Sequence, residues 1–429
     1  MAQHELKKEL GLFETTVYGI GIILGAGIYA IIGSAAGVTG DAVWLSFVLA
    51  AIMAAFTGLS YAELSSMYPK AAAAYVYTKK AFNRKDLSFL IAWIVIIGLV
   101  VAGATVAIAF AGYFSAIFAT PIIPVAMAAI ILFTIINFIG IKESAKFNII
   151  STFIEAGGLI LIIILGFSFW GSPDVNYFAM QNGIPGLLAG VTLVFFAFIG
   201  FENVANISEE TKNAHKVIPK ALLISLFFST ILYILVAVSA VSVLGSSALA
   251  ASNAPLTDVA VAVVGPGILW IYSIIALFAT GNTLLIFMIV ASRMLYGISR
   301  EGGIPKIFGH VHHKKKTPFY SILVIGIASM LFILAEDIAF VATLTDIGVF
   351  IAYFFVNLAL IWLRYKKPDE ERHFKMPGNI GRFPVLAALG ALSCFLILFQ
   401  FEITVILAEI VVIIVGAIIY WAYSWYKRV

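Results

Sequence analysis

The 429-residue chain is far more apolar than a water-soluble protein, with 62% hydrophobic and only 11% charged residues, against about 25% charged residues in soluble domains. This composition excludes a soluble globular protein and predicts a polytopic membrane protein. The formal net charge of +4 does not indicate nucleic-acid binding, because the basic residues are scattered between apolar segments and form no concentrated basic face. The single cysteine, Cys394, excludes an internal disulfide framework and a cysteine-based structural metal site.

Apolar stretches separated by polar turns recur along the whole chain. Each has about the length that a helix needs to cross about 30 Å of hydrocarbon. The stretches are 12–36, 42–66, 87–117, 122–141, 148–170, 185–206, 220–244, 267–297, 319–335, 338–363, 383–400 and 403–426. The sequence therefore predicts an all-α integral membrane protein with twelve transmembrane helices in a single domain, residues 1–429.

The distribution of basic residues predicts the orientation of these spans. If the loops alternate sides from a cytoplasmic N-terminus, all 26 Lys and Arg residues fall on the cytoplasmic side. The opposite loops carry acids such as Asp41, Asp174 and Asp258. The positive-inside rule therefore predicts a multi-pass protein of the cell membrane with both termini in the cytoplasm.

The first span contains four glycines, Gly19, Gly21, Gly25 and Gly27, within nine positions. Glycine costs a helix interior about 0.8–1 kcal/mol relative to alanine, so this density predicts an interrupted helix. Backbone freed at membrane depth survives only where it is buried in protein or faces a polar cavity. The interruption therefore indicates a binding site. The alternative is that the glycines only permit close helix packing.

Glu155 is the lone carboxylate of the fifth span and has no basic neighbour at helical spacing. Burial in hydrocarbon favours the neutral form of such a group, so we expect Glu155 to carry a proton during transport. Two alternatives remain open. The carboxylate could help to hold a cation, or a protonated Glu155 could serve only as a hydrogen-bond partner of a neighbouring helix.

The sixth span repeats the anomaly of the first, because residues 190–206 combine a central Gly200 with Glu202 and two asparagines. It begins on the opposite side of the membrane, as expected if spans 1–5 and 6–10, about 12–170 and 185–363, are inverted repeats. Paired interruptions in such halves point to a substrate site. Half-helix N-termini attract anions and half-helix C-termini attract cations, so the pair suits a zwitterion.

Glu202 itself has three possible roles. It could couple protonation to movement of the half-helices, attract a cationic substrate, or cap freed backbone N–H groups.

Other polar residues in the spans have simpler expected roles. Thr280, Asn282 and Thr283 in span 8 can form hydrogen bonds between helices. Arg293 marks the cytoplasmic end of that span, and we expect its side chain to reach the membrane interface. Asp346 is expected near the outer end of span 10, where solvation is cheap. Glu409 in span 12 is expected to face lipid headgroups or an oligomer contact.

Other chemistries find little support in the sequence. No pair of histidines has metal-ligand spacing within a span, no phosphate-binding loop is present, and no loop is long enough for a nucleotide-binding domain. The spans offer no catalytic pair, so we expect neither an enzyme nor a bound cofactor or metal. A channel remains a second class, although no acidic ring or carbonyl filter is visible.

Five segments, standing in the same order along the chain, resemble transporters of the amino acid-polyamine-organocation (APC) superfamily, of the bacterial or archaeal amino acid permease type. They cover residues 21–28, 61–77, 195–202, 209–221 and 291–306. The glycine motif alone is weak, but together the segments span nearly the whole chain. The resemblance implies a LeuT-type fold with a 5+5 inverted repeat, discontinuous helices 1 and 6, and accessory helices at about 383–426.

The resemblance also implies a substrate site. The carboxylate of an amino acid would meet the backbone N–H groups of Gly25, Ala26 and Gly27, and its α-amino group would meet carbonyls near Ile23 and Ile199. Phe196 aligns with the aromatic residue that closes over the substrate in this family. Some proton-coupled relatives carry a lysine at the position of Glu155, so the charge is reversed in this chain.

These observations predict a secondary active transporter that moves an amino acid by alternating access, in symport with a proton through Glu155 and Glu202. The alternative is an exchanger of amino acids, amines or polyamines, and sodium coupling is less favoured. The expected partners are an amino acid and the lipid bilayer. The absence of basic residues from the expected pocket disfavours acidic substrates and leaves small neutral, bulky apolar and cationic ones open.

Overall fold

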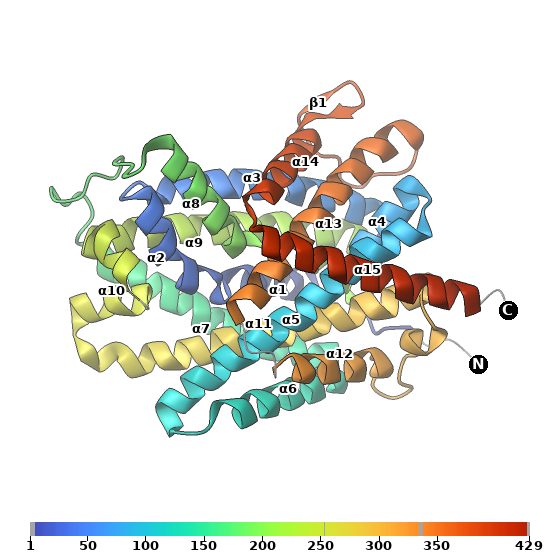
Figure 1. The fold of residues 1–429 in the computed structure, drawn as a ribbon, viewed down its shortest axis with the longest axis horizontal. Coiled ribbons are helices and arrows are strands. Elements are labelled where there is room, and N and C mark those ends of the chain that lie inside the picture. The colour runs from blue at the N-terminus through green and yellow to red at the C-terminus, as the bar shows by residue number, and fades with distance from the viewer. Residues whose placement is uncertain (1–4, 253, 334–337, 427–429) are drawn as a thin grey trace.

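The computed structural model describes residues 5–252, 254–333 and 338–426, and nearly all of them lie in helices (Figure 1). The α-helices are α1 (Leu12–Leu24), α2 (Ala26–Thr39), α3 (Val43–Met67), α4 (Ala73–Phe82), α5 (Lys85–Phe118), α6 (Ile122–Ile139), α7 (Ile141–Phe167), α8 (Gly183–Phe198), α9 (Ala214–Ala251), α10 (Pro255–Val264), α11 (Leu269–Arg300), α12 (Phe319–Phe332), α13 (Ile338–Lys366), α14 (Val385–Ile397) and α15 (Ile403–Tyr426). The 3₁₀ helices are η1 (Phe201–Glu210), η2 (Pro266–Ile268), η3 (Lys306–Gly309) and η4 (Leu398–Gln400), and the strands β1 (Asn379–Ile380) and β2 (Phe383–Pro384) form an antiparallel hairpin.

Ten helical segments of the described chain are long and apolar enough to cross a membrane. The other two predicted spans coincide with α12 and α14, which are apolar but shorter. An all-helical membrane architecture is therefore confirmed, whereas the number twelve stays a prediction. Two further helices, α4 and α10, were not predicted, because each has only ten residues and falls within a connection between predicted spans.

The broken ends of the interrupted helices lie in the interior of the bundle. α1 packs against α7 and α9, α2 packs against α8 and α9, and α3 covers both α8 and α9. On another side, α5 packs against α11 and α13 (Figure 1). Apolar side chains at the interruptions, such as Leu24, Ile28 and Phe201, are fully buried. The interrupted backbone, which could least tolerate contact with lipid, is thus covered by neighbouring helices.

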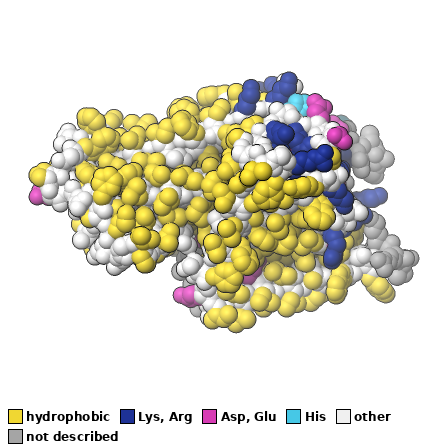
Figure 2. All heavy atoms as spheres, turned by 90° about the horizontal axis from the view of Figure 1, so that it is seen from above, with side chains coloured by type: hydrophobic (Ala, Val, Ile, Leu, Met, Phe, Trp, Pro, Cys, Tyr) yellow, Lys and Arg dark blue, Asp and Glu magenta, His cyan; other side chains and the backbone are white. Residues whose placement is uncertain are grey.

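Basic side chains collect at one end of the molecule. Figure 2 shows Lys and Arg gathered there, whereas the visible flank is covered by hydrophobic side chains. The outermost helices carry large exposed apolar residues, for example Ile135 of α6 and Trp421 and Trp425 of α15. An apolar flank with a polar end is the surface that a bilayer requires.

Arg293 departs from its prediction. Instead of reaching an interface, its side chain is fully buried, and its guanidinium donates two hydrogen bonds to the carboxylate of Glu210, at 3.0 and 2.9 Å, and one to Asn137. Such a bidentate pair is among the strongest that side chains form. The prediction was wrong because the partner, at the end of η1, lies far away in the sequence.

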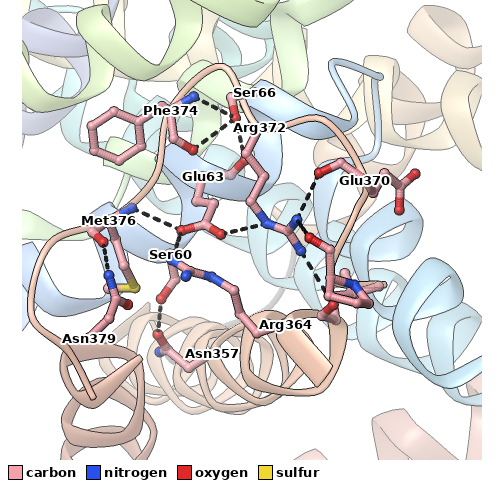
Figure 3. Close-up of polar contacts among 12 residues, drawn as sticks. Ser60, Glu63, Ser66, Asn357, Arg364, Glu370, Arg372, Phe374, Met376 and Asn379 are labelled. Carbon is pink, nitrogen blue, oxygen red and sulfur yellow. Dashed lines mark hydrogen bonds and ion pairs between the residues drawn. The ribbon is translucent and has the colours of Figure 1, made fainter. Parts of the chain in front are cut away.

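A second buried ion cluster ties α3 to α13 and to the segment 367–384 that follows it (Figure 3). The carboxylate of Glu63 accepts hydrogen bonds from Arg364 at 2.5 Å, from Arg372 at 3.0 Å and from the backbone N–H of Met376 at 2.9 Å. Nearby, Ser60 of α3 donates to the side-chain oxygen of Asn357 at 2.6 Å. Segment 367–384 is thereby held against the end of α3.

Candidate functional site

The first helix interruption lies between α1 and α2. Gly25 separates the two helices with φ −22° and ψ −150°, which are not helical angles. The last carbonyls of α1, including that of Ile23, and the first N–H groups of α2, including those of Ala26 and Gly27, therefore lack helical partners. N–H donors and C=O acceptors without helical partners therefore lie within a few residues of each other.

Two of the glycines are also required for space. A Cβ on Gly25 would lie 2.5 Å from the hydroxyl oxygen of Thr283 in α11, and one on Gly27 would lie 2.9 Å from the Cα of Ala197 in α8. Both distances are well below ordinary contact between non-bonded atoms. Close packing and interruption are therefore not alternatives here, because the same short segment shows both.

The second interruption lies between α8 and η1. After Phe198 the chain passes through Gly200 with φ +120° and ψ −20°, a conformation that favours glycine, and continues as a 3₁₀ helix of ten residues. Runs of 3₁₀ helix this long are uncommon and often mark a hinge. A Cβ on Gly200 would lie 3.0 Å from the side chain of Ile22 in α1. The two interruptions, distant in sequence, thus meet in space.

Tyr233 of α9 links the ends of the two broken helices. Its buried hydroxyl donates a hydrogen bond to the carbonyl of Ile23 and lies 3.2 Å from the carbonyl of Ala197. A hydroxyl has a single proton and cannot fully satisfy two acceptors at once. One carbonyl therefore retains capacity for a cationic donor such as an ammonium group. Sequence reasoning missed Tyr233, because nothing local distinguishes it among 17 tyrosines.

A cavity of about 100 Å³ opens beside the two interruptions. One part of its wall comes from the broken helices, namely Ile22, Ile23, Gly27, Phe196, Ala197 and Ile199. The rest comes mainly from α5, α11 and α13, including Val95, Leu99, Ala102, Val106, Thr283, Phe287, Asp346 and Val349. Its volume has room for about three water molecules, and its surface is mostly apolar with a few polar groups, as is common for small-molecule sites.

The cavity gathers most, but not all, of the predicted site residues. Of those predicted to bind substrate, Ile23, Gly27, Phe196 and Ile199 line it. Gly25 and Ala26 belong to the same interruption but are not among the described lining residues. The predicted coupling residues separate, since Glu202 lines the cavity and Glu155 lies in a different polar cluster.

Glu202 is held at the second interruption by two hydrogen bonds. Its carboxylate accepts one from the backbone N–H of Gly200 at 2.9 Å and one from the hydroxyl of Tyr353 in α13. The first bond satisfies a freed backbone donor, so the capping role considered for Glu202 has a direct structural counterpart. Its suggested role in coupling stays a prediction.

Glu155 is fully buried in α7, against the first interrupted helix. It accepts a hydrogen bond from the amide of Asn282 in α11 at 3.1 Å, and its second carboxyl oxygen has no partner among the described residues. The same amide network includes Asn148, and a Cβ on Gly21 of α1 would lie 2.8 Å from the amide nitrogen of Asn148. A change at Glu155 can therefore reach α1 through direct contacts.

Asp346 does not lie where the sequence placed it. It was expected at a solvated outer end, but it lines the central cavity, and its Oδ1 is buried and accepts no hydrogen bond from any described residue. The expectation failed because it considered only the position of Asp346 along the span. The direction in which its side chain points around the helix axis was not considered. A lone carboxylate in an apolar span was the signal that could have identified it.

A larger hollow of about 370 Å³ lies between the N-terminal segment and the ends of η1 and α11. Charged groups of both signs line it, among them Lys8, Glu209 and Arg300. It shares no lining residue with the central cavity and includes none at either interruption. We therefore take the central cavity as the candidate substrate site.

Comparison with known proteins identifies a family and relatives for this chain. The family model described as "Amino acid permease" matches residues 10–424. The branched-chain amino acid permease BcaP of Bacillus subtilis is 31% identical to the chain, with 98% of this chain and 94% of the relative covered. The methylthioribose transporter of the same organism is 29% identical over equal shares, and the vacuolar cationic amino acid transporter 4 of Arabidopsis thaliana is 28% identical over 85% of this chain and 65% of the relative.

Proposed function

Because the chain belongs to the amino acid permease family, within the APC superfamily that its motifs resemble, we propose that it is a secondary active transporter of amino acids driven by a proton gradient. The meeting of two interrupted helices at one cavity carries this proposal. Interruptions that expose backbone groups of both polarities bind the two charged ends of an amino acid and leave its side chain in the cavity.

The α-groups of the substrate bind to backbone. The carboxylate accepts hydrogen bonds from the N–H groups of Ala26 and Gly27, at the N-terminal end of α2, and from that of Gly25 in place of its 3.3 Å bond to the carbonyl of Gly21. The ammonium donates to the carbonyls of Ile23 and Ile199. The Tyr233 hydroxyl already donates to the carbonyl of Ile23, so the bound ammonium shares that carbonyl with Tyr233 or replaces it as the donor. Phe196, which lines the cavity, covers the bound substrate.

Glu155 is the proposed proton carrier. Its burial, its single hydrogen-bond donor and the partnerless second oxygen, all among described residues, fit a carboxyl group that alternates between protonated and ionised forms. Contact of its network with α1 at Gly21 supplies a route from protonation to the substrate site. Glu202 couples protonation to movement of the half-helices at the second interruption.

The proposal includes a topology. Twelve spans in a LeuT-type 5+5 inverted repeat, with both termini in the cytoplasm of a multi-pass cell-membrane protein, agree with the single basic end of the molecule (Figure 2). Alternating access then consists of movement of the broken helices relative to the surrounding ones.

The relatives do not share one substrate, since their names refer to branched-chain amino acids, methylthioribose and cationic amino acids. The test therefore uses two amino acids of different character. Purified protein in proteoliposomes should accumulate labelled leucine or lysine when the interior is made alkaline, and should lose accumulation when a protonophore is added. A sodium gradient alone should drive none.

The coupling role is tested with Glu155→Gln, which removes the titrating group and keeps the shape. We expect gradient-driven accumulation to fall to the level seen without a gradient, while exchange of labelled for unlabelled substrate persists. Glu409→Gln is the matched control, because Glu409 is also buried in a membrane helix but does not line the site. Undiminished accumulation by Glu155→Gln would reject the assigned role, and uptake that requires internal counter-substrate in the wild type would identify an exchanger.

A further inference from the structure

The central cavity has an apolar wall apart from the helix interruptions. α5 contributes Val95, Leu99, Ala102 and Val106, and α13, which packs against α5, contributes Val349. An amino acid whose α-groups are held at the interruptions extends its side chain toward this wall. This placement of the amino acid rests on the proposed function. The wall then determines which side chains are accepted.

Two carboxylates line the cavity, and their surroundings differ. Glu202 receives hydrogen bonds from the Gly200 N–H and from the Tyr353 hydroxyl. Asp346 receives none at Oδ1 from the described residues, although that atom is buried. The described lining contains no lysine, arginine or histidine that could balance the charge. Of the two carboxylates that line the cavity, Asp346 is therefore the one with an oxygen, Oδ1, that no described protein group donates to.

A buried carboxylate oxygen without a partner is costly, because it loses its hydration and gains no hydrogen bond in return. A ligand that brings a positive charge to Asp346 removes this cost. A purely aliphatic side chain would instead bury the same oxygen beside methyl groups and leave it unpaired. The apolar wall of the cavity suits methylene groups. Wall and carboxylate together match a side chain with an aliphatic stem and a cationic end.

We infer that Asp346 determines substrate specificity by accepting a hydrogen bond from the side-chain ammonium of a basic amino acid. Val95, Leu99 and Val349 contact the methylene stem of that side chain. Phe196 and the two interruptions hold the α-carbon and its charged groups, as they would for any amino acid. The contribution of Asp346 is thus separable from substrate binding as such.

The separation is tested with lysine and norleucine, which differ only in the terminal amine. In thermal-shift titrations of the purified full-length chain, lysine should stabilise the wild type at a concentration at least about tenfold lower than norleucine, the ratio expected for one hydrogen bond to a charged group. Asp346→Asn should abolish this preference and retain the response to norleucine. Glu409→Gln, which alters another buried carboxyl oxygen without a described partner, should keep the wild-type preference.

A second variant keeps the inference testable if Asp346→Asn does not fold. Asp346→Glu keeps the charge and advances it by one methylene, so the preferred ligand should shift from lysine toward ornithine, which is shorter by one methylene. An unchanged lysine-to-ornithine ratio in Asp346→Glu, or an unchanged lysine preference in Asp346→Asn, would overturn the inference.

The outcomes distinguish this inference from the function on which it rests. A wild-type protein stabilised by leucine and norleucine but not by lysine overturns the role of Asp346 and leaves amino acid transport standing. A wild-type protein stabilised by none of the twenty amino acids overturns the proposed function itself, and the inference with it.

Discussion

Single residues decide how the freed backbone of the site is satisfied. Tyr233 places one hydroxyl between two carbonyls from different helices, and Glu202 caps the N–H of Gly200. Unpaired backbone groups at membrane depth cost several kcal/mol in hydrocarbon. These two side chains therefore stabilise the interruptions when no ligand is bound. A ligand that binds to the same backbone groups has to share or replace the hydrogen bonds of Tyr233 and Glu202.

Replacement of Tyr233 by phenylalanine tests this sharing. The change leaves a buried carbonyl without its donor, so we expect Tyr233→Phe to lower the stability of the substrate-free protein by about 1–3 kcal/mol. Bound substrate should restore part of the loss, because its ammonium supplies the missing donor. Thermal unfolding with and without substrate measures both effects.

Tyr272→Phe provides the matched control for that measurement. The Tyr272 hydroxyl donates to the carbonyl of Gly158 at 3.1 Å, away from both interruptions. Its loss should destabilise the protein with and without substrate alike. Equal behaviour of the two variants would contradict the role given to Tyr233.

At the scale of elements, the site depends on how closely α2 approaches α8. A Cβ on Gly27 would lie 2.9 Å from the backbone of Ala197, and backbone cannot turn away as a flexible side chain can. The N-terminal end of α2, with its freed N–H groups, is therefore positioned by the absence of a single side chain.

Gly27→Ala should separate these two helices. Overpacking of this kind costs about 1–3 kcal/mol, and the displaced N–H groups should bind the substrate carboxylate less well. We expect a lower unfolding temperature and a substrate affinity reduced by about tenfold or more, measured by thermal shift and by uptake.

Gly157→Ala is the control for this element. Gly157 also lies within a helix, α7, but no heavy atom lies within 4 Å of the position its Cβ would take. Alanine there should leave affinity unchanged and should raise stability, because it favours helix over glycine. A Gly27→Ala protein with wild-type affinity would show that α2 does not hold the carboxylate.

At the scale of the whole molecule, the buried ion clusters join segments that are far apart in sequence. Glu63 brings together α3, the end of α13 and the segment that follows it (Figure 3). Arg293 and Glu210 similarly join α11 to η1. The Glu63 cluster joins segments outside the interruptions, whereas the Arg293–Glu210 pair anchors η1, the continuation of the second interrupted helix, to α11.

Glu63→Gln should destabilise the protein strongly. Two nearly buried guanidinium groups, Arg364 and Arg372, would lose their counter-charge, and breaking a buried pair on one side costs about 3–5 kcal/mol. Asp86→Asn removes one partner of the exposed pair with Arg84 and should lower the stability far less, because solvent screens such a pair. Unfolding temperatures of the two variants give the comparison, and similar losses would refute a structural role of the Glu63 cluster.

The sequence by itself determined the class of molecule and the location of its unusual backbone. Hydrophobic length is summed along the chain, so it predicted membrane helices and the approximate bounds of most of them without any knowledge of packing. The family was predicted separately, from the resemblance of five motif segments. Glycine density is equally local, and it located the interruption between α1 and α2.

Only the tertiary structure decided what faces what. The meeting of the two interruptions, the position of Tyr233 between their carbonyls, the burial of Arg293 against Glu210 and the exposure of Asp346 to the cavity all depend on how each helix is rotated and which partner it packs against. Residues in an apolar span look alike from the sequence whether they face lipid, a neighbouring helix or a cavity, because hydropathy records the environment of the span and not the direction of a side chain.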